Sequence, residues 1–480
     1  MLLRGGRLGA IDREVLEFIS SREADSWIFE ADLLVDRAHL VMLKDRGLIK
    51  AEEFATIVGA LDQLFAEGEE ALGEGEDVHE AIEACVIARA GQVGGRMHTG
   101  RSRNDEVATC IRLALREQLL GLMEELNMLA ATLVDRAGKN TDTLIPGFTH
   151  LQHAQPTTLA HHLLAHADAL LRDQSRLEDA YRRVNLSPLG AAAFASTGFE
   201  IDRDQTCRLL GFDGLLENSM DAVSSRDFVL EVLAHLSILM VNLSRMAEEI
   251  ILWSTSEFAY LEIDDLFAST SSIMPQKKNP DTAELVRGKT GSVLGGLISA
   301  LTICKALPLS YNRDLQEVTP HLWRSVSLVR GAVRIMDGCV SSLRFNTSRL
   351  EESAGAGFST ATELADSLVR KTGIPFRTAH QIVGRIAATN TSPTLEELDA
   401  AGEDVARIRP SAMGYSRDDL ARALNPRSNV ALRSRPGGPA PAETGRMVAQ
   451  RLEMLAQRRA GVRERREKAS RALQALREIR

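Results

Sequence analysis

The chain of 480 residues carries a net charge of −9, and 44% of its residues are hydrophobic but only 4% are aromatic. That length allows two to four domains, and burial that rests on Leu, Ala and Val rather than on aromatic rings suits packed helices. The negative charge argues against a general nucleic-acid binder. The five cysteines lie far apart and form no CxxC pair, which favours reduced thiols in a cytoplasmic protein over a zinc site.

Residues 1–104 are predicted to form a small helical domain. Apolar residues recur at helical spacing over 32–46 and over 51–67, and a turn rich in Gly and Glu precedes another helix from His79. The first residues contain no apolar stretch of the kind found in signal peptides, so we expect no signal peptide.

A basic loop, 96–106, ends this region. Asn104 is predicted to cap the helix that follows, with Asp105 and Glu106 in its first turn. The arginines of the loop are candidates for gripping carboxylates bidentately, although an isolated string of this kind is more often an exposed basic turn. The next helix is predicted to run to about Gly138, because leucines recur along it at steps of three and four, as in a long bundle helix.

A second compact loop spans 146–156, and a helix is predicted from Pro156 to about residue 185. His162 and His166 lie four residues apart on this helix and could share a metal ion. No third ligand lies at a suitable spacing, so packing or surface roles are expected and no metal site is predicted. His150 lies in the loop itself, where a single histidine is usually structural.

The most apolar segment, 228–253, contains an arginine and three glutamates and is predicted to be a buried helix rather than a membrane span. The Arg-rich helix at 458–480 is interpreted as a solvated amphipathic face, because the aromatic residues typical of RNA binding are absent from it. No nucleic-acid or membrane partner is therefore expected.

The segment Ser269–Asp281 concentrates four hydroxyl side chains and two lysines at the start of a helix. Asn279 suits an N-cap and Pro280 suits the first helical position. The first part of the segment has no hydrophobic period, so it should be a loop. It therefore presents its polar side chains at the positive end of a helix dipole, a place that favours carboxylate anions.

This segment resembles the GSSxMPxKxNP signature of the fumarase/aspartase superfamily, in the form typical of argininosuccinate lyases, with Thr270 in place of the usual Gly. The resemblance begins at Gly5-Gly6-Arg7 and covers nearly the whole chain. Further strings resemble the family's in the same order. The segment 96–106 resembles HTGRSRNDQ, with Glu106 in place of Gln; the segment 146–156 resembles GYTHLQ-AQP, and the segment 436–441 resembles GGPAP.

The resemblance implies an all-α protein of three helical domains. They would be an N-terminal domain at 1–104, a central bundle of long helices at 105–350 that carries the signature loop 269–280, and a C-terminal domain at 351–480. Members of the family are homotetramers in which the central bundles pack together and each site draws residues from three subunits. No cofactor and no metal are implied.

The resemblance also implies β-elimination of argininosuccinate to fumarate and L-arginine, a step of arginine biosynthesis. Ser271 and His150 would be the base and the acid, with the assignment of the two roles open. Lys277 would stabilise the dianion, and Glu284 would pair with His150. The alternatives are another lyase of the superfamily, such as adenylosuccinate lyase, and a non-enzymatic structural protein of the delta-crystallin kind.

The same resemblance places a further set of side chains around the small-molecule substrate. These are His79, Arg103, Asn104, Thr149, Asn279, Asp281, Tyr311, Arg313, Gln316 and Asp36. Asp36 departs from the family, which most often has Ser there, and is interpreted as a variant edge of the binding site. His153, Arg313 and Thr319 are further departures from the usual residues.

Overall fold

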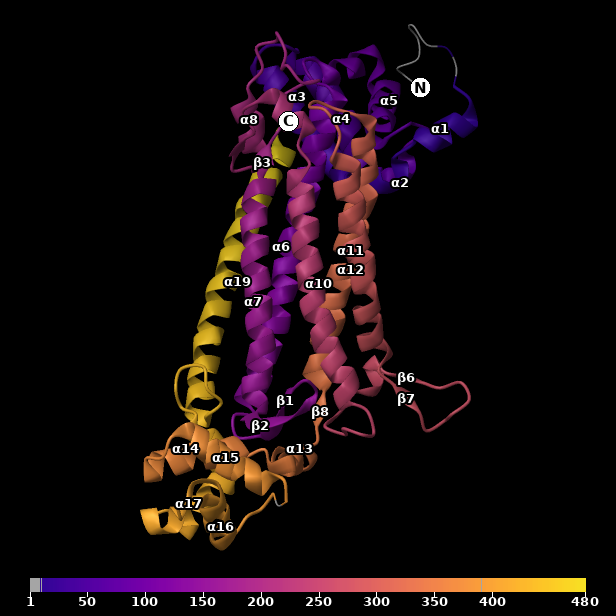
Figure 1. The fold of residues 1–480 in the computed structure, drawn as a ribbon. Helices are drawn as coiled ribbons and strands as arrows, with labels where there is room; N and C mark the ends of the chain where they lie inside the picture. The colour runs from indigo at the N-terminus through magenta and orange to yellow at the C-terminus, as the bar shows by residue number, and fades with distance from the viewer. Residues whose placement is uncertain (1–8, 10, 390) are drawn as a thin grey trace.

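The computed structural model describes residues 9, 11–389 and 391–480; the Gly5-Gly6-Arg7 string lies outside this part. Long helices run side by side between two ends of an elongated molecule (Figure 1). The helices of the first hundred residues lie at the upper end of that view, and short helices from the last third of the chain lie at the lower end. The predicted all-α class is confirmed.

The N-terminal helices pack around α3, which is buried along almost its whole length. Its residue Arg37 is buried, and the guanidinium donates to the carbonyl oxygens of Leu476, Arg477 and Ile479 at the far end of the chain. The elements of this region are α1 (Arg13–Ile19), α2 (Arg22–Asp25), α3 (Phe29–Asp45), α4 (Ala51–Glu67), α5 (Val78–Ala90) and the 3₁₀ segments η2 (Glu69–Ala71) and η3 (Gly91–His98).

Five long helices form the bundle: α6 (Arg103–Gly138), α7 (Leu159–Val184), α10 (Asp227–Trp253), α11 (Asp281–Cys304) and α12 (Val318–Ser342). The leucine repeat of α6 faces inward, because every leucine of the repeat from Leu115 onward is at most 1% exposed; these are Leu115, Leu119, Leu122, Leu126, Leu129 and Leu133. Regular burial at steps of three and four is what fixes neighbouring helices side by side. The short helices α8 (Arg203–Leu209) and α9 (Ser219–Ser224) and the 3₁₀ segments η4 (Asp265–Phe267) and η5 (Arg313–Glu317) connect the long helices.

Helix α10 is long and apolar enough to cross a membrane by length and composition, yet half of its most apolar window is buried inside the protein. It packs closely against α7, α11 and α12. A helix that is hydrophobic around most of its circumference is expected in the middle of such a bundle. The prediction of a buried helix is in line with this packing.

Two predicted helix starts are wrong by one or two residues. Ser102, not Asn104, caps α6: its hydroxyl accepts the backbone N–H of Asn104, and the Asp105 carboxylate accepts the backbone N–H of Ser102. A serine followed three residues later by a carboxylate is a capping box, which outcompetes an asparagine further inside. Helix α11 begins at Asp281 with Pro280 as its N-cap residue.

The segment predicted as a loop at 146–156 is a β-hairpin, and α7 begins at Leu159 rather than at Pro156. Strands β1 (Leu144–Thr149) and β2 (Gln152–Thr158) pair antiparallel, with a bulge between Pro146 and Phe148. The other strands are two residues long: β3 (Leu186–Ser187) beside β4 (Gly214–Leu215), β5 (Leu261–Glu262) beside β8 (Arg344–Phe345), and β6 (Ser269–Thr270) beside β7 (Lys278–Asn279).

The short helices after residue 346 enclose a hydrophobic core of their own, built around residues such as Leu364, Leu368 and Leu398. The elements are α13 (Thr347–Ala354), η6 (Ala356–Phe358), α14 (Ala361–Thr372), α15 (Phe376–Ala387), α16 (Leu395–Ala406), η7 (Pro410–Met413), α17 (Arg417–Leu424) and α18 (Pro426–Leu432). The last helix, α19 (Pro441–Glu478), returns along α6, and the side chain of Asn127 donates to Leu455 O at 3.1 Å. We therefore propose that the C-terminal domain is limited to about 351–440.

Candidate active site

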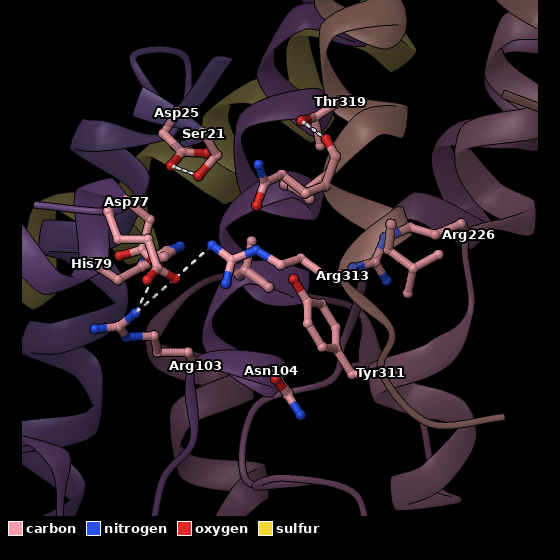
Figure 2. A pocket seen from close by; sticks show the side chains of 15 residues that line it. Ser21, Asp25, Asp77, His79, Arg103, Asn104, Arg226, Tyr311, Arg313 and Thr319 are labelled. Atoms are coloured by element: carbon pink, nitrogen blue, oxygen red, sulfur yellow. Dashed lines mark hydrogen bonds and ion pairs between the residues drawn. The ribbon is translucent and has the colours of Figure 1, made fainter. Parts of the chain in front are cut away.

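A cavity between the N-terminal helices and the start of α12 collects six of the side chains predicted to bind substrate. They come from α5, from the start of α6 and from the segment before α12, and Figure 2 labels five of them, all except Gln316, around the cavity. The six are His79, Arg103, Asn104, Tyr311, Arg313 and Gln316. Residues separated by more than two hundred positions thus share one wall.

The cavity presents both signs of charge. Arg103 pairs with Asp77 at 2.8 Å, and Arg313 pairs with Glu76 at 2.6 Å (Figure 2). Arg313 also donates to the carbonyl of Ile19, which helps to fix its guanidinium in the wall of the cavity. A cavity lined by paired cations and anions suits a ligand that itself carries an ammonium and a carboxylate, because each end then finds a partner.

Five further polar lining residues were missed by the sequence analysis: Ser21, Asp25, Glu76, Asp77 and Arg226. Ser21 donates to Asp25 at 2.6 Å from the turn before α2, and both face the cavity. Burial raises the pKa of the Asp25 carboxyl, although His79 opposes the shift. Arg226 is 4% exposed and holds backbone carbonyls of the turn before α10. The i,i+4 spacing of Ser21 and Asp25 was the available signal for a shared position on one helix face.

Behind this cavity lies a buried network of five ionisable side chains: Asp32, Asp36, His79, Arg101 and Glu106. Arg101 contacts both Asp36 at 2.6 Å and Glu106 at 2.8 Å, and His79 Nδ1 contacts Asp32 at 2.8 Å. Three acids face two cations, so full ionisation would leave one excess negative charge in a low-dielectric environment. Such an excess is costly, and one carboxyl therefore holds a proton.

The pKa shifts within this network follow that charge count. Burial raises the pKa of Glu106 well above its usual range, and it raises the pKa of Asp36 to about 6 although Arg101 opposes both shifts. Burial alone would lower the pKa of His79, but the charge and hydrogen bond of Asp32 and the charge of Glu106 outweigh it and raise that pKa to about 10. His79 is therefore an imidazolium at neutral pH, and its Nε2 has no hydrogen-bond partner among the described residues.

This shift predicts a loss of stability at alkaline pH. The pKa of His79 is about 10 in the folded protein against an ordinary value of 6.5, so the folded state binds its proton more tightly. The stabilisation is fully present below pH 6.5 and is lost as pH rises through about 10. We expect the free energy of unfolding, measured by urea denaturation from about pH 6 to about pH 10, to fall more steeply in the natural protein than in His79→Gln. Equal slopes would contradict the raised pKa.

The prediction that Asp36 contacts substrate is not supported by its position. Its side chain is 1% exposed, is ion-paired to Arg101 and does not line the cavity. The aspartate does hold a cationic group, as its charge suggested, but that group belongs to the protein. Ser21 and Asp25, from an earlier part of the chain, do line the cavity.

Thr149 and His150 lie at the exposed tip of the β1–β2 hairpin. His150 and Leu151 form its two-residue turn with φ angles of +56° and +58°. A turn of this hand favours Asn and Gly, and each non-glycine residue in the left-handed region costs about 1–3 kcal/mol. A histidine kept in such a turn projects from the end of the bundle, and strained positions of this kind are concentrated at functional sites.

The signature segment forms an exposed flap between β6 and β7 that extends away from the lower end of the bundle (Figure 1). The Ser271 hydroxyl oxygen accepts the backbone N–H groups of Ile273 and Met274, at 3.3 Å and 3.1 Å. Two N–H donors aimed at one hydroxyl oxygen favour its ionised form. Lys277 is exposed on the same flap, and its backbone carbonyl accepts the N–H of Ser271.

The base of the flap is fixed by the residues on either side of it. Ser269 donates a short hydrogen bond to Asp281, and Lys278 pairs with Asp265 at 2.6 Å. Asn279 lies in β7 opposite Ser269, so it serves the strand pair instead of the predicted helix cap. In this arrangement Asp281 and Asn279 hold the flap in place, and Ser271 and Lys277 remain accessible.

The predicted site residues therefore fall into separate parts of one chain. The cavity and the flap lie at opposite ends of α11, which is roughly 36 Å long for its 24 residues at about 1.5 Å per residue. Glu284, predicted to pair with His150, lies on the first turns of α11 and has Arg287 at 3.9 Å. Within one chain the described residues show no contact between Glu284 and His150.

A third potential ligand does lie beside His162 and His166, contrary to the expectation from spacing. Glu249 on α10 approaches both rings, with its Oε2 atom 3.0 Å from His162 Nε2 and 2.6 Å from His166 Nε2. The glutamate follows His166 by 83 residues, so no spacing rule applied to one helix would have found it.

A long-helix bundle with a hydroxyl-and-lysine flap at one end defines a lyase of the fumarase/aspartase kind, and comparisons with known proteins agree. A lyase family model matches residues 19–295, and a model of the argininosuccinate lyase C-terminal region matches residues 358–431. The argininosuccinate lyase of Methanothrix thermoacetophila is 66% identical over 100% of this chain and 98% of its own. That of Methanosarcina mazei is 59% identical over 95% of this chain and 94% of its own. The chain belongs to the argininosuccinate lyase family.

Solved structures show the same fold. The crystal structure of EDDS lyase in complex with formate is 35% identical, covers 98% of this chain and 95% of its own, and has a TM-score of 0.88. A class II fumarase from Schistosoma mansoni has a TM-score of 0.71 at 16% identity, over 83% of this chain and 91% of its own, and so shows likeness of fold alone.

Proposed function

We propose that the chain catalyses the β-elimination of argininosuccinate to fumarate and L-arginine, a step of arginine biosynthesis. The observation that carries the proposal is the full-length match to argininosuccinate lyases, combined with an accessible Ser271 and Lys277 on an intact flap. Free cysteines throughout the described chain support a cytoplasmic location.

The cavity of Figure 2 suits the amino-acid end of the arginine part of the substrate. That end carries an ammonium and a carboxylate. Asp25, Glu76 and Asp77 would attract the ammonium, while Arg103 and the His79 imidazolium would attract the carboxylate. Tyr311 and Gln316 would position the same end by hydrogen bonds from the segment before α12.

The flap suits the succinyl end. In the proposed reaction Ser271 takes a proton from the carbon next to one carboxylate, and the electron pair moves onto that carboxylate to give a dianion. Lys277 and the N-terminus of α11 stabilise the added charge, which is the main barrier to removing so weak an acid proton. The C–N bond then breaks, fumarate forms, and His150 assists protonation of the leaving guanidino nitrogen.

The cavity and the flap must come from different copies of the chain if they act on one substrate molecule. The long helices expose large apolar side chains that a single copy leaves uncovered; they include Ile238 and Val241 on α10, Leu285, Leu294, Ile298 and Leu301 on α11, and Ile335 on α12. Exposed apolar rows on a bundle are typical of subunit interfaces. We therefore propose a homotetramer with shared sites, and a monomer in sedimentation analysis would contradict it.

Shared sites predict complementation between inactive variants. Arg103→Met damages the cavity and Ser271→Ala damages the flap, so each variant alone should lose most of its activity. Co-expressed, the two should assemble some sites that contain an intact cavity and an intact flap, and turnover should reappear. The matched control combines Ser271→Ala with Lys277→Met, which both damage the flap and should recover nothing. No recovery in either mixture would favour sites built within one chain.

The absorbance of fumarate gives a direct test of the proposed reaction. We expect fumarate to form from argininosuccinate and not from adenylosuccinate, the substrate of the rival lyase. Turnover of adenylosuccinate alone would replace the proposal by that second activity. An intact tetramer without turnover of either substrate would favour a structural protein of the delta-crystallin kind.

A further inference from the structure

The histidines of α7 and the glutamate of α10 form a cluster outside the catalytic parts described above. His162 and His166 extend from one face of α7, four residues apart, and their rings lie 5.1 Å from each other. Both direct Nε2 toward the same oxygen of Glu249. The three atoms that could serve as metal ligands all lie within 4.8 Å of one another.

The separations fit a small divalent ion. A tetrahedral zinc ion about 2.0–2.1 Å from each ligand atom places those atoms roughly 3.3–3.4 Å apart. The observed separations from Glu249 Oε2 are 3.0 Å and 2.6 Å, and all three ligand atoms lie within 4.8 Å of one another. Movements of at most about 1 Å per atom would therefore admit the ion. Two imidazoles and one carboxylate are a ligand set typical of zinc, with the fourth position left for water.

The surroundings hold the ligands in place and leave a path for entry. The Trp253 ring lies 4.6 Å from the ring of His162, and an apolar floor that includes Leu163 and Ile250 lies beneath the cluster. The side chains of His162, His166 and Glu249 are still 23%, 17% and 41% exposed. In a single copy of the chain, an ion could therefore reach them from solvent without unfolding of the bundle.

The other two clusters of potential ligands among the described residues differ from this one in their burial and in the charge beside them. One joins Asp32, His79 and Cys110, and the other joins Asp32 with Asp36 and Glu106. Both are fully buried, and the guanidinium of Arg101 already lies against Asp36 and Glu106. A cation there would meet a fixed positive charge. No such cation contacts Glu249, whose described partners are the two imidazoles.

We propose that His162, His166 and Glu249 bind a divalent transition-metal ion of the zinc class. Without metal, each Nε2–H donates to the carboxylate; with metal, the Nε2 lone pairs and the carboxylate oxygen turn to the ion. The ion joins the first turns of α7 to the last turns of α10, close to the hairpin that carries His150. Its role is to fasten the lower end of the bundle.

Equilibrium dialysis of metal-stripped, tag-free protein against Zn²⁺ tests the site. We expect one tight ion per chain, and we expect His166→Gln or Glu249→Gln to weaken binding by at least about 10–100-fold, since even outer-shell changes cost that much at metal sites. His162→Gln provides a second imidazole variant. Circular dichroism and sedimentation establish that each variant folds and assembles like the natural protein.

His235→Gln is the matched control. This histidine lies on α10, is 19% exposed and has a single glutamate partner at 3.5 Å, so its loss should leave Zn²⁺ binding unchanged. Co²⁺ in place of Zn²⁺ should give the visible absorption of a tetrahedral ion with nitrogen and oxygen ligands, and Zn²⁺ should raise Tm in the natural protein but not in Glu249→Gln. The proposal is overturned if the natural protein binds no ion, or if folded His166→Gln and Glu249→Gln bind it as the natural protein does.

Discussion

Replacement of Ser271 by alanine is expected to lower kcat by about 10²–10⁴-fold, the range that a positioned proton-transfer group contributes. A serine hydroxyl is a weak base unless its ionised form is stabilised. The backbone N–H groups of Ile273 and Met274 already point at its oxygen, and Lys277 lies on the same flap. Loss of the hydroxyl removes the proton acceptor and leaves the cavity for the amino-acid end of the substrate untouched.

Substrate binding separates this role from a structural one. Calorimetric titration of Ser271→Ala with argininosuccinate should show affinity close to that of the natural protein, because the cavity residues are unchanged. Ser272→Ala is the matched control, since Ser272 is the next residue and lies exposed on the same flap. Turnover by Ser271→Ala at the natural rate would remove Ser271 from the mechanism, whichever group acts as the acid.

Replacement of Arg101 by methionine is expected to lower the free energy of unfolding by about 3–5 kcal/mol, the cost of leaving buried charges without their partner. Arg101 is 7% exposed and contacts Asp36 and Glu106, so its loss would leave the three buried acids, one of them protonated, facing only the imidazolium of His79. Thermal and urea unfolding would measure the change. The large effect follows from the uncompensated negative charge, since methionine retains much of the apolar volume of the arginine stem.

Two comparison variants sharpen that measurement. Arg96→Met removes an exposed arginine that pairs with Glu53 at 3.2 Å, and surface pairs contribute only about 0–1 kcal/mol. Adding Glu106→Gln to the Arg101 variant removes one of the unpaired acids and should recover part of the lost stability. An Arg101→Met protein as stable as Arg96→Met would show that the network relaxes or admits water at no cost.

The long helices could be predicted from the sequence because their signal is local. The leucine repeat of α6 requires no knowledge of distant residues, and the predicted end of the helix at Gly138 is confirmed. The hairpin at 144–158 was missed for the opposite reason. Its strands carry prolines at Pro146 and Pro156 and lack apolar alternation, and they are held by pairing with each other rather than by propensity.

The residues of the candidate site can also be divided into those with a local sequence signal and those without one. Segments such as 96–106 and 269–281 carry their residue types in one short string, so these strings and their resemblance to the superfamily pointed to Arg103, Ser271 and Lys277. Residues defined by contact between distant helices were not accessible in this way. Arg226 reaches the cavity from the turn before α10, and Glu249 approaches His166 across 83 residues of chain.

The return of α19 along α6 has a consequence for the folding of the protein. The side chain of Asn127 donates a hydrogen bond to the carbonyl of Leu455, and Arg37 donates to three carbonyls between Leu476 and Ile479. These hydrogen bonds form only when α19 has docked. A chain folded without residues 441–480 would therefore carry an open groove beside α3 and α6, against which α19 packs. Docking of α19 closes that groove, so the upper end of the bundle is completed by contacts between residues as much as 442 positions apart in the sequence.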